Sequence, residues 1–201
     1  MIRLHTTPRS GHGHRVELLL RSLGLDYEVA EAPGPMRETA AFAALNPLRQ
    51  IPVLEDGELV LADSNAILVY LAKRYGAGSQ WLPEDPVGAA QVQRWLSIAA
   101  GEVKYGPAHA RAAIHFGFEV DQPLAHKLSA RLLAFMDQHL RERSWLAADH
   151  ATIADLACYA YIAHAPEGGV DIAPYRAVDA WLKRVEALPA FKPMPASPIP
   201  A

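Results

Sequence analysis

The segment from residue 45 to residue 67 constrains the fold more than any other part of the chain. Two prolines, Pro47 and Pro52, lie on either side of its first loop. A proline disfavours helical conformation in the residue before it, so a helix that precedes Pro47 must end at Asn46. Pro52 has no N–H to donate to a sheet, and we expect it at the first residue of a strand or in a bend. This loop therefore separates a helix from a strand.

A hairpin and a helix are predicted immediately after this loop. Asp56-Gly57 lies between two short apolar runs, and this dipeptide is a strong signal for a tight turn between paired strands. Asp63-Ser64 then offers a helix cap. The apolar positions that follow the cap are spaced as one face of a helix. They are Ile67, Leu68, Leu71 and Tyr75.

The chain before this segment predicts a strand, a helix and a second strand. Residues 2–5 alternate apolar and polar side chains, and residues 27–29 give a second short strand signal. Between them the apolar residues are spaced as one helix face, and Gly24 closes that helix. Strands joined in this way should be parallel, with a right-handed connection. With a short alanine-rich helix over 37–45, residues 1–76 follow the order β-α-β-α-β-β-α.

This order resembles the glutathione-binding half of the cytosolic glutathione transferases, a thioredoxin-like domain. That family carries a loop of the pattern Asn-Pro-x-x-Gln/Lys-Val/Ile-Pro and, after a hairpin, a helix that begins Glu/Asp-Ser-x-Ala-Ile. Here residues 46–52 read Asn-Pro-Leu-Arg-Gln-Ile-Pro and residues 63–67 read Asp-Ser-Asn-Ala-Ile. Two motifs at the right separation are far more specific than either alone. The chain is identified as a bacterial, serine-type member, similar to the theta, beta and zeta classes.

The resemblance implies a glutathione site along the loop that ends at Pro52. The Ile51-Pro52 bond would be cis, a conformation that is common only before proline. The N–H and C=O of Ile51 would then point outward and pair with the cysteinyl segment of glutathione, as a neighbouring strand would. Arg49 and Gln50 would hold the glycine carboxylate. Considered alone, Arg49 would be only a solvated charge on a loop.

The γ-glutamyl end of glutathione carries an ammonium group and a carboxylate together. The resemblance implies that Asp63 takes the ammonium, while Ser64 and the first N–H groups of its helix take the carboxylate. Considered alone, the pair would be only a helix cap. The motifs taken together favour the binding role, so glutathione is the expected co-substrate.

A hydrogen-bond donor to the sulfur is the next requirement of such a site. In this family the thiol of glutathione is the nucleophile, and the protein has only to make it a thiolate. The loop after the first strand holds no tyrosine and no cysteine, and Ser10 precedes Arg15 and Val16 much as in the serine classes. We predict that Ser10 donates to the thiolate, at the positive end of the first helix. Its simpler alternative role is an ordinary N-cap.

One residue departs from the usual pattern of the serine classes. Gly11 follows the predicted donor, where many members have proline, and it should make the loop more pliable. Thr6 or Thr7 could then be the donor instead. His12 or His14 could assist as a cation or a base near neutral pH. The simpler expectation for both histidines is that they face solvent, and it is firmer for His14.

A second, all-helical domain is predicted after a short linker. Glycine and proline gather between residues 77 and 86, which we take as the linker between domains at 1–76 and 87–201. Three apolar helix faces follow. They are Val92, Trp95, Leu96 and Ala99; Leu124, Leu128, Leu132, Phe135, Met136 and His139, on a helix that starts near Pro123; and Val178, Trp181, Leu182 and Val185. Residues 192–201 should form an irregular tail.

Thr152 and Asp155 form a capping-box pattern before an apolar run. It is similar to the motif that begins the buried core helix of the family's second domain, with aspartate in place of the more usual glutamate. Cys158 lies in the same run and is expected to be a small buried hydrophobe. As the one cysteine of the chain it cannot form an intramolecular disulfide. It also lies far from the first helix in sequence, which disfavours a mixed-disulfide enzyme.

The second substrate, a small hydrophobic electrophile, would bind between the two domains. His12, Tyr105 and His109 are the candidates to contact it, the last two because they lie in a stretch interrupted by Gly-Pro. Trp95 and Phe116 could also face the second substrate, but aromatic residues at helical spacing are more often core residues.

Composition excludes several other classes of function. The 201 residues carry a net charge of −3, which gives no basic surface for nucleic acid. No apolar run is long enough to span a membrane, and the first residues lack the layout of a signal peptide. A cytoplasmic protein is therefore expected. No histidine pair has a third ligand at metal-binding spacing, so no metal is expected.

The predicted function is that of a glutathione S-transferase that activates the glutathione thiol for attack on small hydrophobic electrophiles. Two alternatives stay open on the same fold. One is a glutathione-dependent reductase, peroxidase, isomerase or ether-cleaving enzyme, and the other is a transferase-like binding module without activity. Family members usually pair across a two-fold axis, so the resemblance also implies a homodimer.

Overall fold

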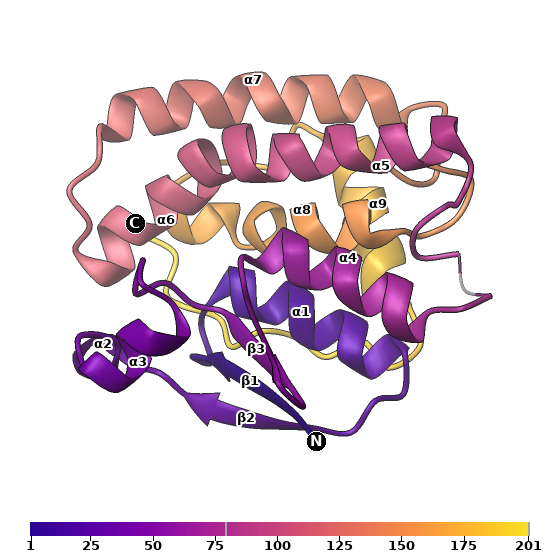
Figure 1. Cartoon of the computed structure of the whole chain (residues 1–201). Coiled ribbons are helices and arrows are strands. Elements are labelled where there is room, and N and C mark those ends of the chain that lie inside the picture. Colours follow the sequence, from indigo (N-terminus) through magenta and orange to yellow (C-terminus); the bar gives the residue numbers. More distant parts are fainter. Residues whose placement is uncertain (79, 201) are drawn as a thin grey trace.

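The first half of the chain forms a four-stranded sheet with helices. The computed structural model describes residues 1–78 and 80–200 (Figure 1). In chain order its first elements are β1 (Ile2–Thr6), α1 (Gly11–Ser22), β2 (Tyr27–Glu31), α2 (Gly34–Arg37), α3 (Ala40–Leu45), β3 (Val53–Asp56), β4 (Leu59–Ala62) and α4 (Ser64–Tyr75). The strand order is β2-β1-β3-β4. The pair β1–β2 is parallel, while β1–β3 and β3–β4 are antiparallel, which confirms the thioredoxin-like order.

Local signals set most of these boundaries. Gly24 has a φ of 65° just after α1, as a left-handed residue beyond a helix end does. Gly57 has a φ of 61° in the turn between β3 and β4. The predicted helix over 37–45 is wrong in one respect, because two short helices occupy this region. The Thr39 side chain accepts a hydrogen bond from the Phe42 N–H and so starts a new helix at Ala40.

The second half is helical throughout its described elements. They are α5 (Pro86–Ile98), the π-helix η1 (Ala99–Ala108), α6 (His109–Phe116), α7 (Gln122–Leu140), α8 (Ile153–Ala163), the 3₁₀ turn η2 (Ala165–Gly168) and α9 (Arg176–Glu186). An N-terminal thioredoxin-like domain is thus followed by a helical domain, as expected. Ser79, within the predicted linker, lies outside the described residues. The boundaries at residues 76 and 87 stay predictions.

Helix α8 is the centre of the helical half. Every residue from 153 to 162 is buried, and the helix packs against α1 and α4 as well as α5 and α9. Figure 1 shows α1 and α4 between the sheet and the helical layer that contains α8. Because one cluster of buried side chains runs through both halves, the core does not stop at the domain boundary. The site between the halves is therefore held by packed elements on both sides.

The buried face of α7 differs from the predicted one. Leu124 is half exposed and Phe135 lies at the surface, where its ring stacks on Trp95. The buried residues are Ala125, Ser129, Leu132, Leu133, Met136, Asp137 and Leu140. Ser129 lies against Gly106 of η1, and a Cβ at Gly106 would come within 3.1 Å of the Ser129 backbone nitrogen. Small residues at the contact let the two helices approach closely, and this close approach determines which face of α7 is buried.

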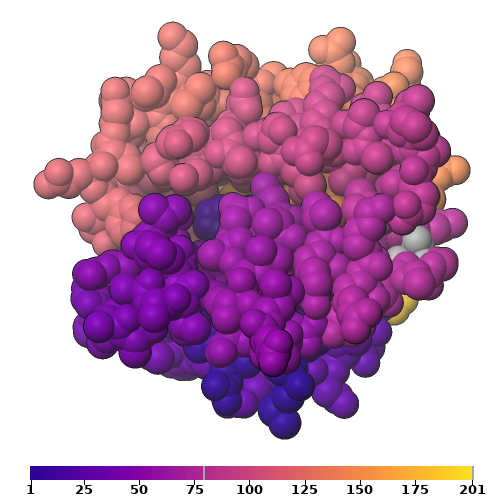
Figure 2. Space-filling model, viewed as in Figure 1, coloured from indigo at the N-terminus to yellow at the C-terminus, as the bar shows by residue number. Residues whose placement is uncertain are grey.

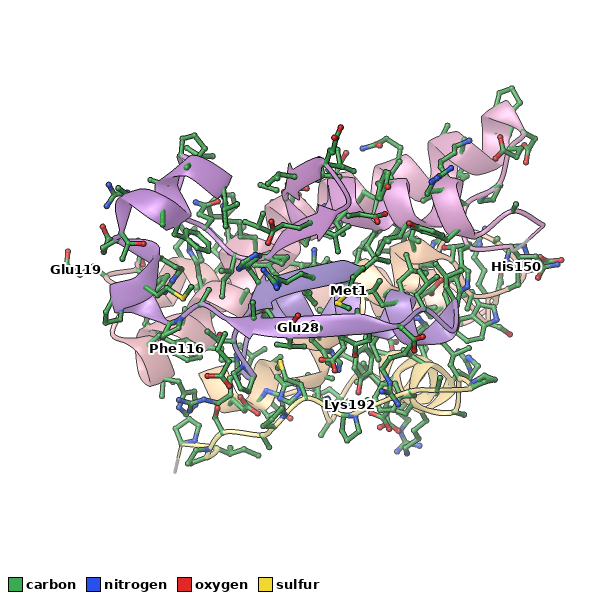
Figure 3. All side chains as sticks on the ribbon, turned by 60° about the horizontal axis from the view of Figure 1, so that its bottom comes forward. Met1, Glu28, Phe116, Glu119, His150 and Lys192 are labelled. Carbon is green, nitrogen blue, oxygen red and sulfur yellow. The ribbon has the colours of Figure 1, made fainter. Side chains whose placement is uncertain are left out.

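The carboxyl-terminal segment, which the structure describes over residues 187–200, forms no helix or strand there but runs along α1. The Ala190 carbonyl accepts a hydrogen bond from Arg21, and the Lys192 carbonyl accepts one from His14 Nε2 at 2.7 Å. Met194 and Ser197 are buried further along. This segment is the yellow trace below α1 in Figure 1, and Figure 3 labels Lys192 on it. The tail is irregular, as predicted, but Met194 and Ser197 anchor it to the rest of the fold.

Candidate functional site

Ser10 is the N-cap of α1. Its Oγ accepts a hydrogen bond from the Gly13 N–H at 3.1 Å, and its backbone C=O accepts one from the His14 N–H. A hydroxyl that accepts through a lone pair can still donate its proton to another group. The first turn of α1 holds no acidic side chain, so the positive end of the helix is not neutralised there. Ser10 can therefore cap its helix and donate to a thiolate at once.

Thr6 is enclosed beneath the first turn of α1. Its side chain is buried, and a Cβ at Gly13 would lie 1.8 Å from Thr6 Oγ1. The threonine thus packs against the inside of the turn that Ser10 caps, which disfavours it as the donor. Thr7 is half-buried in the loop and stays an open alternative.

The N-terminus of α4 lies beside that of α1. Asp63 has a φ of 74°, and its Oδ1 accepts hydrogen bonds from the N–H groups of Asn65 and Ala66, both at 2.9 Å. A left-handed backbone at a non-glycine residue costs about 1–3 kcal/mol and is often found at functional sites. The buried Ser64 Oγ lies 3.3 Å from His12 Nδ1. Ser64 and His12 therefore link the part of the site predicted to bind the γ-glutamyl group with the part predicted to bind the sulfur.

Arg15 supplies a buried positive charge behind these groups. Its side chain is 1% exposed, and NH1 donates to Asn65 Oδ1 at 2.9 Å and to Ser64 Oγ at 3.3 Å. Among the described residues its Nε and NH2 have no hydrogen-bond partner, and its hydrogen bonds go to a hydroxyl and an amide oxygen, not to a carboxylate. Burial lowers the pKa of Arg15, but guanidinium groups stay protonated in proteins. Two helix N-termini and one uncompensated cation thus favour bound anions here.

The expectation that His12 and His14 face solvent is wrong. His12 packs edge-on to Tyr161 of α8, with ring centroids 5.0 Å apart. Burial first, and then the charges of Arg15 and Lys104, hold the pKa of His12 well below its usual value. Burial also lowers the pKa of His14, beneath the carboxyl-terminal segment. At neutral pH both rings are uncharged, so neither supplies a cation to the sulfur.

The loop before β3 adopts the expected bend. The Ile51-Pro52 bond is cis, and among residues 1–78 and 80–200 the N–H and C=O of Ile51 make no hydrogen bond. Gln50 is exposed. Arg49 has a φ of 54°, and its NH1 donates to the backbone oxygen of Glu38 at 3.2 Å and also contacts the Glu38 carboxylate. Arg49 would have to share or leave this partner to hold a glycine carboxylate.

Comparison with known proteins gives a consistent result. Residues 4–80 match the family model described as Glutathione S-transferase, N-terminal domain, and residues 107–189 match Glutathione S-transferase, C-terminal domain. A crystal structure of a glutathione S-transferase from Xanthobacter autotrophicus is 32% identical, with a TM-score of 0.90 and 97% of each chain covered. The chain belongs to the glutathione S-transferase family. The fold and both sequence motifs agree with that assignment.

Two further relatives are informative. Mouse glutathione S-transferase theta-3 is 33% identical over 159 residues, which are 74% of this chain and 66% of the mouse protein. This match spans just under two thirds of its relative's length. A glutathione transferase homologue from Drosophila mojavensis, solved with bound glutathione, is 28% identical with a TM-score of 0.85. It aligns over 94% of this chain and 88% of its own.

Of the three predicted second-substrate candidates, His12 lies on α1, whereas Tyr105 and His109 lie on η1 and α6. Tyr105 is half exposed, and its ring packs edge-on to the half-buried His109 at 5.0 Å. Burial and Lys104 lower the pKa of His109. Trp95 is fully buried, as predicted, but Phe116 is 42% exposed, so its expected place in the core is wrong. Gly106 and Pro107 interrupt the helix and leave these side chains at its surface.

The surface is hollowed where the two halves meet. Figure 2 shows a depression between the violet surface around α2 and α3 and the surface of the helical half, with indigo surface from the start of the chain at its floor. A separate cavity of about 710 Å³ is lined by residues of α7, α9 and the segment after α7. None of the predicted glutathione-site residues lines that cavity.

Tyr161 was missed by the sequence analysis. A Cβ at Gly11 would come within 2.7 Å of the Tyr161 ring, so Gly11 is required by close packing. This glycine therefore has a packing role that was not expected, and the predicted pliability of the loop stays a prediction. The two residues lie 150 positions apart in sequence and on different domains, and nothing in the local pattern of either indicates the contact.

The described part of the chain lacks two further features. No helix there is both long and apolar enough to cross a membrane. No group of three or more His, Cys, Asp or Glu side chains in the same residues is arranged to hold a metal ion.

Proposed function

We propose that this protein is a glutathione S-transferase that binds glutathione between the N-termini of α1 and α4 and stabilises its thiolate. The observation that carries the proposal is the meeting of Ser10, Ser64 and the buried Arg15 at two adjacent helix N-termini. Arg15 also links α1 to α4 through its hydrogen bonds to Ser64 and Asn65, so it holds the two helix N-termini together. A relative solved with bound glutathione supports the same ligand.

The proposed site would contact all three residues of glutathione. The free N–H and C=O of Ile51 would pair with the cysteinyl backbone. Asp63 would take the γ-glutamyl ammonium through the carboxylate oxygen that does not cap α4, and the start of α4 would take the carboxylate. The glycine carboxylate would bind near Arg49 and Gln50.

Ser10 would act on the sulfur itself. Its O–H donates to the thiolate, and the positive end of α1 further favours the charged form. The thiol proton leaves to solvent, and the thiolate then attacks an electrophilic carbon of a small hydrophobic substrate. Lowering a thiol pKa from about 8.5–9 to about 7 raises the thiolate fraction at neutral pH roughly tenfold or more.

A protein thiol is not needed in this scheme. Burial raises the pKa of Cys158 to about 12, and the sulfur contacts the Trp95 carbonyl inside the helical half. This argues against a mixed-disulfide reaction, although reduction or isomerisation by bound glutathione stays an alternative. Turnover of aryl halides, organic hydroperoxides and disulfides by the same preparation would separate these reactions.

The cytoplasmic location, a role in detoxification and the homodimer are proposed from the family resemblance. They do not depend on the geometry of Ser10. Light scattering that gave the mass of one chain would remove the dimer.

Calorimetric titration with glutathione at several pH values tests the role of Ser10. Wild type should bind with proton release, and Ser10→Ala should bind with similar affinity but release no proton. Ser10→Gly is the paired variant, because glycine keeps most of the capping energy without the hydroxyl. Ser97→Ala, on the exposed face of α5, is the matched control. Unchanged proton release in both Ser10 variants would refute the assignment.

A further inference from the structure

Arg111 of α6 reaches from the helical half to the loop that carries Ser10. Its side chain is 2% exposed, and NH1 donates to the Arg9 carbonyl oxygen at 3.0 Å. That carbonyl belongs to the peptide group that joins Arg9 to Ser10. A residue of the second domain therefore holds the peptide plane directly before the predicted thiolate donor.

The rest of the Arg111 guanidinium is fixed by the helical half. Nε donates to Glu167 Oε2 at 2.5 Å, and NH2 donates to Ser197 Oγ at 3.3 Å. Glu167 Oε1 in turn accepts hydrogen bonds from the Ser197 N–H and from His164 Nδ1. The fork of an arginine is planar and rigid, so partners on three sides leave it a single orientation.

Glu167 stays ionised inside this network. Burial alone would raise the pKa of its carboxyl, but the bonds from His164, Ser197 and Arg111 outweigh burial and lower the pKa to about 2. The buried cation and the buried anion therefore compensate each other at neutral pH. Unlike Arg15, Arg111 is paired with a carboxylate, so its charge is compensated and has little effect on a ligand.

Close packing prevents the network from shifting. A Cβ at Gly168 would come within 2.5 Å of the Arg111 backbone nitrogen, so η2 lies directly against α6. The guanidinium carbons of Arg9 and Arg111 lie 5.4 Å and 5.3 Å from the centre of the Phe116 ring. Figure 3 labels Phe116 near the end of α6. The partly exposed Phe116 thus packs beside both arginines.

Three other restraints on Ser10 come from its own neighbourhood. Its N–H donates to the Thr7 carbonyl at 3.0 Å, its C=O accepts from the His14 N–H, and its Oγ accepts from the Gly13 N–H. The bond from Arg111 adds a restraint across the domain boundary. It makes the position of the donor depend on how the helical half is assembled.

We propose that Arg111 is a positioning residue for the thiolate chemistry, acting through the Arg9 carbonyl on the orientation of Ser10. Glu167 and Ser197 hold Arg111 in turn, so the carboxyl-terminal segment is part of the support of the site. This inference rests on the proposed role of Ser10. Arg111 is buried and does not contact glutathione. It should therefore affect the chemical step and not glutathione binding.

The test measures the pKa of the thiol of bound glutathione from the ultraviolet absorbance of the thiolate, and turnover of an aryl halide. Arg111→Lys keeps the charge but loses the fork that holds Arg9, Glu167 and Ser197 together. It should raise the thiol pKa by about one unit. Because small misplacements of a reacting group cost up to about a hundredfold, kcat should fall about tenfold or more, with the glutathione KM within about twofold.

Two further variants serve as controls, one in case Arg111→Lys does not fold and one for the general effect of replacing an arginine with lysine. Ser197→Ala leaves the buried ion pair intact and should change the thiol pKa and kcat in the same direction by a smaller factor. Arg141→Lys is the matched control, because Arg141 is an exposed arginine paired with Asp137 at the end of α7. It should change neither quantity. If neither Arg111→Lys nor Ser197→Ala moved the thiol pKa, the inference would be wrong.

A double-mutant cycle separates this inference from the proposed role of Ser10. If Arg111 acts through Ser10, then Arg111→Lys should cause no further loss of kcat in a Ser10→Ala background. Equal losses in both backgrounds would overturn the positioning role while leaving Ser10 as the donor. A Ser10→Ala protein with an unchanged thiol pKa would overturn the role of Ser10 and with it the inference.

Discussion

His12 shows how strongly burial changes the behaviour of a single residue at this site. Burial, Arg15 and Lys104 all lower its pKa in the folded protein, whereas in the unfolded chain the imidazole has its ordinary pKa of about 6.5. Below about pH 6.5 the unfolded state therefore binds more protons than the folded state. The contribution of neutral His12 to the stability of the folded state is complete above that pH. It is lost as the pH falls toward the pKa of His12 in the folded protein.

His12→Gln should make the stability of the protein less sensitive to acid. One histidine that is neutral when folded and charged when unfolded contributes a slope of up to about 1.4 kcal/mol per pH unit. Urea denaturation at about pH 7.5, 6.5 and 5.5 would give the free energy of unfolding of both proteins. The wild type should lose more stability than the variant over the lower interval. Parallel pH profiles would contradict the buried, neutral state of His12.

Residues that act locally could be predicted from the sequence, and residues that act through packing could not. Ser10 and Asp63 were recognised because a cap is defined by the few residues that follow it. The packing role of Gly11 was missed because the group that requires it, Tyr161, comes from the other end of the chain. No local sequence pattern indicates the role of Arg111, since its partners Glu167 and Ser197 lie 56 and 86 positions away. The predicted contacts with glutathione stay predictions.

At the scale of elements, the start of α8 shows a capping residue with a wider role than a cap. Asp155 Oδ2 accepts a hydrogen bond from the Thr152 N–H, as the capping box predicts, and another from the Thr152 hydroxyl. Its Oδ1 accepts two more, from the Leu146 N–H at 3.0 Å and from Trp181 Nε1 at 2.9 Å. One buried carboxyl thus ties the segment before α8 and helix α9 to the core helix.

Asp155→Ala should therefore cost more stability than Thr152→Ala. Losing the threonine cap should cost about 1 kcal/mol. Losing the carboxyl leaves the buried N–H groups of Leu146 and Trp181 without a partner, at about 1–3 kcal/mol each. Guanidinium denaturation would measure both changes. Asp179→Ala is the control, because Asp179 forms only an exposed pair with Lys183, and such pairs contribute little to stability. Equal costs for Asp155→Ala and Thr152→Ala would show that the carboxyl acts only as a cap.

The elements that were predicted correctly are those with a regular apolar face and clear end signals. Helix α9 buries the four residues expected of it, and the β3–β4 hairpin turns at Asp56-Gly57. The face of α7 could not be read from its large apolar residues, because contact with η1 favours the small side chains of Ala125 and Ser129. The split between α2 and α3 depends on one side-chain bond from Thr39, which a spacing pattern does not show.

At the scale of the whole molecule, the two halves share one hydrophobic core. Residues of the sheet and α1 belong to the same buried cluster as those of α5, α7, α8 and α9. Arg111 and the carboxyl-terminal segment add polar contacts across the boundary. Two domains connected in this way should unfold together, because neither can lose its partner without exposing its own apolar surface.

This prediction can be tested because all four tryptophans, at positions 81, 95, 145 and 181, come after the sheet and α4 in the sequence. Phe42 belongs to a separate small cluster with Ala32 and Val53, on the sheet and α3. Phe42→Ala should cost about 3–5 kcal/mol. If unfolding is cooperative, the tryptophan fluorescence transition should move to lower denaturant by the full amount, although no tryptophan lies in the altered cluster. Phe118→Ala, at an exposed position after α6, should move it very little. A fluorescence transition that stayed in place after Phe42→Ala would mean that the helical half folds without the sheet, and that the site between them is assembled from two independent bodies.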